Sequence, residues 1–152
     1  MTYDATETRQ ALLDTIAEAI DELAVALAAL GAAYEQLDEV NADLLEAELF
    51  RPIQTAYGRA QRTHAAFAER YGLPGRTFQP AMEGAPSTGA QGFVDVAVEA
   101  ADFADQRLAD LQDSLAPIEV GDPELRAGLS EVRTLISGTE SRATRFVQTL
   151  GR

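Results

Sequence analysis

The chain has 152 residues, of which 46% are hydrophobic and 24% are charged, and its formal net charge is −13. This length and composition predict one globular domain over residues 1–152. The negative charge disfavours binding to nucleic acid or to an anionic membrane surface, because both repel an acidic protein. The absence of cysteine excludes disulfides, thiolate metal ligands and a cysteine nucleophile.

The first residues contain no basic cluster followed by an apolar run, and no uninterrupted apolar stretch is long enough to cross a bilayer. We therefore expect no signal peptide and a cytoplasmic location.

A capping box formed by Asp4 and Glu7 predicts the start of the first helix. Apolar residues then recur three or four positions apart, which places them on one helix face. They are Leu12, Ile16, Ile20, Leu23, Leu27, Leu30, Tyr34 and Leu37.

The turn into the second helix has two candidate positions. A second capping box at residues 43–46 favours a turn at 40–43 and a helix that begins at about residue 44. A break at Gly31 is the alternative. Within this helix Pro52 is expected to cause a kink, because proline lacks a backbone donor and crowds the preceding turn.

Residues 72–87 are rich in glycine and proline and are predicted to form a loop. Extended, such a segment can span roughly 50 Å. A helix of about 28 residues is only about 42 Å long. The loop can therefore run the length of a bundle and leave the two helices that it joins parallel.

Two further helices are predicted after the loop. A third capping box at residues 88–91 precedes a helix whose apolar residues cover 93–115 and which ends before Pro117. Asp122, followed by proline, has the pattern of a helix cap and first turn. A fourth helix is therefore predicted over 123–150, and the fold class is an all-α four-helix bundle with a long crossover.

The chain resembles the ferritin-like superfamily over most of its length. Residues 61–72 are similar to the Glu-x-x-His stretch of that family and its exit into the crossover, and segments within 98–143 are similar to its second half. The resemblance implies a single-crossover bundle. In the family, two glutamates and two Glu-x-x-His pairs hold a di-iron or di-manganese centre.

Only part of that ligand pattern is present. The first pair reads Gln61 and His64, and the second has Ala143 where the histidine would stand. The ligands that would remain are His64, Glu99, Glu140 and one of Glu18 and Glu22. The resemblance therefore implies a fold kept after its chemistry was lost, with no cofactor. The alternative is a divergent oxidoreductase that binds iron or manganese through His64, Glu99 and Glu140.

Two rows of charge remain. Arginines at positions 51, 59, 62 and 70 share one side of the second helix. We expect a solvated face that lies against the acidic first helix or a symmetry mate. A docking face for an acidic partner surface or an anionic ligand is the alternative. Six carboxylates along the third helix are likewise expected to form a solvated face, and a cation-binding patch is the alternative.

These observations favour a non-catalytic binding or assembly module, with a homodimer as the expected oligomer. An enzyme is disfavoured. Besides the metal-binding alternative, a third hypothesis is a carrier of a small apolar ligand. Its pocket would lie under the 72–87 loop and be lined by Tyr57, Phe67 and Phe103, although core packing is the default for such aromatic residues.

Overall fold

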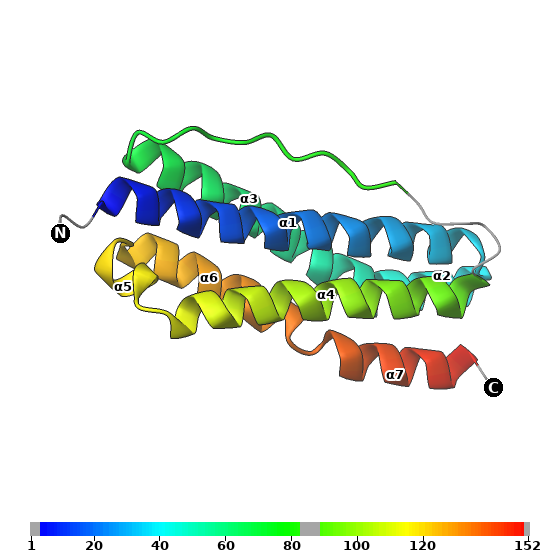
Figure 1. Cartoon of the computed structure of the whole chain (residues 1–152). Coiled ribbons are helices and arrows are strands. Elements are labelled where there is room, and N and C mark those ends of the chain that lie inside the picture. The colour runs from blue at the N-terminus through cyan, green and yellow to red at the C-terminus, as the bar shows by residue number, and fades with distance from the viewer. Residues whose placement is uncertain (1–3, 83–88, 151–152) are drawn as a thin grey trace.

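A computed structural model describes residues 4–82 and 89–150, and all regular structure in these two ranges is helical (Figure 1). The elements are α1 (Ala5–Glu35), α2 (Glu39–Leu45), the π-helical turn η1 (Glu46–Phe50), α3 (Arg51–Arg70), α4 (Gly89–Asp113), α5 (Ala116–Glu119), α6 (Pro123–Ile136) and α7 (Thr139–Leu150). Within the same ranges, no helix combines the length and the apolar character that crossing a membrane requires.

The helices form a bundle in which α1 packs on α3 and α4, and α6 packs on the same two helices from the other side. α3 and α4 run in the same direction, opposite to α1 and to the α6–α7 segment (Figure 1). This is possible because residues 72–82, the described part of the predicted 72–87 loop, return along the bundle without regular structure. Residues 83–87 of that prediction lie outside the described residues. We call residues 73–82 the crossover segment.

Both predicted positions for the first turn are wrong. α1 ends at Glu35 and α2 begins at Glu39, so the turn occupies residues 36–38. Asp38 caps α2, because its carboxylate accepts hydrogen bonds from the backbone and side-chain N–H groups of Asn41 at 2.8 and 2.9 Å. Gly31 does not end the helix, since its φ angle is not positive and buried residues continue on both sides of it.

Pro52 produces the expected disturbance in the form of η1, which lies directly before α3. The Arg51 N–H donates to the carbonyl of Glu46, a π-type bond. Proline has no N–H to offer the carbonyl of Glu48 four residues earlier. Arg142 of α7 supplies the missing donor, with its Nε 2.9 Å from that oxygen.

The fourth predicted helix is broken in two, which corrects that prediction. α6 ends at Ile136 and α7 begins at Thr139. Ser and Gly at 137–138 have low helix propensity. The carbonyls freed at the break are satisfied by side chains, since the Thr139 hydroxyl donates to Ile136 at 2.7 Å and Arg142 Nη2 donates to Leu135 at 3.1 Å. The Arg142 side chain therefore donates hydrogen bonds at both irregular points of the fold, η1 and the break between α6 and α7.

The other predicted boundaries are mostly confirmed. The Asp4 carboxylate accepts from the backbone N–H of Thr6 at 3.0 Å, and that of Asp122 accepts from Leu125 at 2.8 Å. α4 ends before Pro117, which lies in the short helix α5. Thr88, the first residue of the third capping box, lies outside the described residues.

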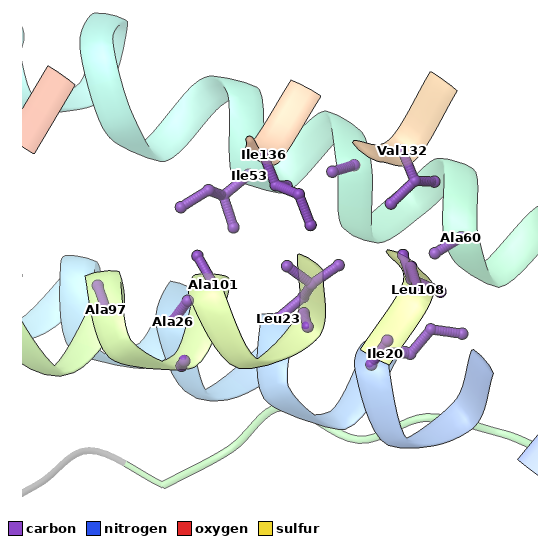
Figure 2. Packing of buried hydrophobic residues seen from close by; sticks show 14 of the residues in the cluster. Ile20, Leu23, Ala26, Ile53, Ala60, Ala97, Ala101, Leu108, Val132 and Ile136 are labelled. Carbon is purple, nitrogen blue, oxygen red and sulfur yellow. The ribbon is translucent and has the colours of Figure 1, made fainter. Parts of the chain in front are cut away.

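The core is built from small and branched apolar side chains, so the helices approach closely. Figure 2 shows residues of this core that converge from four helices: Ile20, Leu23 and Ala26 of α1, Ile53 and Ala60 of α3, Ala97, Ala101 and Leu108 of α4, and Val132 and Ile136 of α6. Alanine is the most frequent buried residue of both α1 and α4, the two helices with the most extensive mutual contact. Between α3 and α6, a Cβ at Gly128 would clash with Thr63, so glycine is required for this approach.

Candidate binding grooves

The first groove lies between α1, α3 and the crossover segment and has a volume of about 480 Å³. Residues of α1 form one wall, residues of η1 and of the first turns of α3 form the other, and the crossover segment borders the groove. Its lining residues are Ala24, Leu27, Ala28, Gly31, Phe50, Gln54, Tyr57, Pro80 and Ala81. None of them is charged. We call it the crossover groove.

The crossover segment is held down by a chain of side-chain contacts. Arg76 forms an ion pair with Asp21 of α1 at 3.0 Å, and its guanidinium lies 4.7 Å from the centre of the Phe78 ring. The Phe78 ring in turn meets the imidazole of His64 edge-on, with 5.3 Å between ring centres. These contacts keep the crossover segment in place over α1 and α3.

Gly31 leaves open space in the wall of this groove. No atom lies within 4 Å of the position that a Cβ would take there, apart from the helix's own backbone and adjacent residues. Glycine inside a helix costs about 0.5–1 kcal/mol relative to alanine. Gly31 and Phe50 also line a smaller hollow of about 220 Å³, together with Tyr34, Glu35 and Glu46. The two hollows therefore share a wall.

Two polar side chains, Tyr57 and Gln54, line the crossover groove. Partial burial and the nearby carboxylate of Asp21 both raise the pKa of Tyr57. Its hydroxyl therefore stays protonated near neutral pH and can donate a hydrogen bond. The groove can accommodate an uncharged apolar molecule that carries a hydrogen-bond acceptor.

The predicted pocket residues lie in three different environments. Tyr57 lines the crossover groove. Phe67 is completely buried in the core, with its ring 4.7 Å from that of Tyr71. Phe103 lies on α4 and is 48% exposed. Sequence reasoning did not find Gly31, because a glycine in a helical pattern gives no signal until the opposite wall is known.

His64, the only histidine, lies on α3 and is 3% exposed. Its ring hydrogen-bonds to the backbone of Leu13, and Nδ1 has no hydrogen-bond partner among the described residues. Burial, and to a smaller extent Arg76, lowers the pKa of His64. The side chain is therefore neutral at pH 7 and packs as an apolar group beneath Phe78.

Glu99 and Glu140 lie in a second groove, between α4 and α7. The structure therefore brings these two carboxylates to one groove and leaves His64 under the crossover segment. Across residues 4–82 and 89–150, no group of three or more histidine and carboxylate side chains is arranged to hold a metal ion. Glu18, one of the two candidates on α1, forms an ion pair with Arg107.

The second groove, of about 500 Å³, lies between α4 and α7, and we call it the α4–α7 groove. Its lining residues are Val94, Asp95, Val98, Glu99, Asp102, Glu140, Ala143, Thr144, Val147 and Gln148. Burial, and then the carboxylates of Glu140 and Asp105, raise the pKa of Asp102. The like charges of this groove are therefore close enough to disfavour one another.

Two of the four arginines in the row on the second helix, Arg59 and Arg70, are paired within the molecule, although not with the helix that we expected. Arg59 contacts Glu131 at 2.7 Å. Arg70 contacts Asp122 at 2.7 Å and Glu124 at 2.9 Å. These partners belong to α6 and its cap, because α6 lies on this side of α3, and not to α1. The two arginines therefore join α3 to α6.

No protein-family model, curated protein or solved structure matches this chain significantly.

Proposed function

We propose that the chain is a non-catalytic binding module with a ferritin-like four-helix fold, and that it holds a small apolar molecule in the crossover groove. The parallel course of α3 and α4 and the connection between them support the ferritin-like assignment. The open space at Gly31 carries the functional part of the proposal.

That space is informative because the chain itself does not require it. Alanine at position 31 would meet no other side chain and would favour the helix by about 0.5–1 kcal/mol. Glycine there is therefore unfavourable for the empty protein. It becomes useful when another molecule packs against the backbone of α1.

The lining of the groove defines the kind of ligand. Its volume of about 480 Å³ falls within the range of small-molecule sites. Its lining residues are uncharged, which favours a neutral ligand over an ionic one. Tyr57 and Gln54 can each hydrogen-bond to a polar group of that ligand. The adjoining hollow at Gly31 and Phe50 allows an elongated shape.

The test is a fluorescence titration with Nile red, an uncharged apolar dye, on the wild-type protein and on two variants. Gly31→Leu fills the groove from its α1 wall. Ala65→Leu adds an apolar side chain at an exposed position of α3 that does not line the groove. We expect saturable dye binding that is lost in Gly31→Leu and retained in Ala65→Leu.

Equal binding by the wild type and Gly31→Leu, with both proteins folded by circular dichroism, would show that the dye binds elsewhere and would refute the proposal. Native mass spectrometry of the freshly purified wild type provides an independent readout. It should detect a small neutral adduct that Gly31→Leu lacks.

A further inference from the structure

The α4–α7 groove has an apolar floor. Val94 and Val98 contribute from α4, and Ala143 and Val147 contribute from α7. Of these, Val94 and Ala143 are buried, whereas Val98 and Val147 are half-buried and accessible from the groove. The floor therefore offers apolar contact area to a molecule outside the chain.

Carboxylates border this floor on both sides. Asp95, Glu99 and Asp102 follow one another along α4, and Glu140 stands on α7. None of the four forms an ion pair within the described residues, and no basic residue lines the groove. Carboxylates at other helix contacts are paired, such as Asp105 with Arg133 at 2.8 Å. The groove therefore concentrates negative charge that no arginine among residues 4–82 and 89–150 neutralises.

The spacing of these groups matches a helix. The α4 wall extends from Val94 to Asp102, which is about 12 Å or two helical turns. Apolar residues at 94 and 98 run parallel to carboxylates at 95, 99 and 102. A helix with an apolar stripe between two rows of basic residues presents the complementary surface at the same spacing.

We propose that the α4–α7 groove binds a basic amphipathic helix of a partner protein. The floor receives the apolar stripe, and the carboxylates of both walls pair with the flanking arginine or lysine residues. The net charge of −13 attracts such a partner over longer distances. The four carboxylates line an open groove and form no compact cluster suited to a metal ion among the described residues, which favours an extended cationic ligand.

The test uses a synthetic helical peptide with one leucine stripe flanked by arginines, and a scrambled peptide of the same composition. Binding to the full chain is measured by fluorescence anisotropy at about 0.15 M salt, where charges more than about 8 Å apart are screened. We expect the amphipathic peptide to bind more tightly than the scrambled one, and its binding to weaken as salt is added.

Matched variants distinguish peptide binding in the groove from attraction by the overall charge of the protein. Asp102→Asn with Glu140→Gln should weaken binding about tenfold, because two pairs with the peptide are lost. Asp110→Asn with Asp113→Asn removes the same charge from α4 outside the groove and should change binding less than about twofold. Val147→Ser should also weaken binding, since it removes part of the floor. Melting curves verify that each variant is folded.

Equal weakening by the two double variants would overturn the proposal, because it would show attraction by net charge alone. Equal binding of the scrambled peptide would do the same. A third result would also overturn the proposal: stoichiometric spermidine displaces the peptide, and Val147→Ser does not change peptide binding. The site would then bind cations without using its apolar floor. This proposal uses none of the residues of the crossover groove, so either proposal can fail without the other.

Discussion

The two grooves of this protein are nearly equal in volume, about 480 and 500 Å³, but they differ in the charge of their lining and in the elements that border them. The crossover groove has uncharged walls and is bordered by a segment held through Arg76 and Phe78. The α4–α7 groove is bordered by four carboxylates and lies beside the last helix of the chain.

The difference follows from where the arginines lie. Arg76 neutralises Asp21 next to the crossover groove, while Arg59, Arg70 and Arg133 join helices at other contacts. Among the residues that the structure describes, no arginine lines the α4–α7 groove. In an acidic chain, a surface without paired arginines keeps its negative charge, which is the basis of the proposed cationic partner, whereas the uncharged lining of the crossover groove is the basis of the proposed apolar ligand.

The largest expected effect comes from Arg142→Ala, which should destabilise the fold by about 2 kcal/mol. The variant loses charge-assisted hydrogen bonds to the carbonyls of Glu48 and Leu135, which lack helical donors. Urea unfolding measures the change. Arg145→Ala, at an exposed neighbouring position of α7, is the control and should change stability by less than about 0.5 kcal/mol.

Arg142→Ala also tests the independence of the two grooves. α7 should lose hydrogen-exchange protection first, because Arg142 connects it to η1 and to the end of α6. Dye binding in the crossover groove should persist while binding of the basic peptide weakens. Loss of both activities together would mean that the grooves form one cooperative unit.

His64 makes stability depend on pH on the crossover side. Burial and Arg76 hold its folded-state pKa below that of the unfolded chain, although Asp14 and the Leu13 backbone act in the opposite direction. The unfolded state therefore binds the proton more readily. This contribution to stability is complete above about pH 6.5 and is lost as the pH falls below it, by at most about 1.4 kcal/mol per pH unit.

Thermal melts between pH 7.5 and 5.5 should show this decrease in the wild type and a smaller one in His64→Phe. Arg59→Gln serves as a control for general charge effects, because it removes a surface ion pair on α3 and leaves His64 in place. Parallel curves for the wild type and His64→Phe would assign the pH dependence to other groups.

Gly31→Ala should stabilise the empty protein by about 0.5–1 kcal/mol, since alanine favours the helix and meets open space. Differential scanning calorimetry measures the shift. Gly128→Ala is the contrasting variant and should destabilise, because its methyl group would clash with Thr63. A destabilising effect of Gly31→Ala would mean that the backbone at this position needs glycine for itself.

The smallest effect on stability is expected from Phe103→Ser, which tests the predicted homodimer. Val96 and Phe103 are exposed on α4, seven residues apart, and neither lines a groove described above. Sedimentation equilibrium should show a dimer for the wild type and weaker association for Phe103→Ser. A wild-type monomer at all concentrations would contradict the prediction.

Much of the fold was predictable because its signals are local. Asp4 and Asp122 cap helices through backbone groups only two or three residues away, and Pro52 disturbs its helix through a missing donor. The first turn was misplaced because Asp38 and Asp43 both offer a plausible cap, and their local patterns do not differ enough to choose between them.

The candidate sites were less predictable, because each groove needs two walls from distant parts of the chain. The sequence predicted that the carboxylates of α4 form a solvated row. In the structure, the chain breaks after Ile136, and α7 with Glu140 lies beside them. Tyr57 was a reasonable pocket residue, but its stripe did not distinguish it from Phe67, which lies in the core.

Periodicity, capping residues and the length of the 72–87 segment were thus sufficient for an all-helical chain with a crossover, since these features act over a few residues or through contour length. The pairing of arginines with α6, and both grooves, depended on long-range packing. Arg142 illustrates the reason. Its side chain satisfies carbonyls on η1 and α6, and that requirement exists only once the helices lie together.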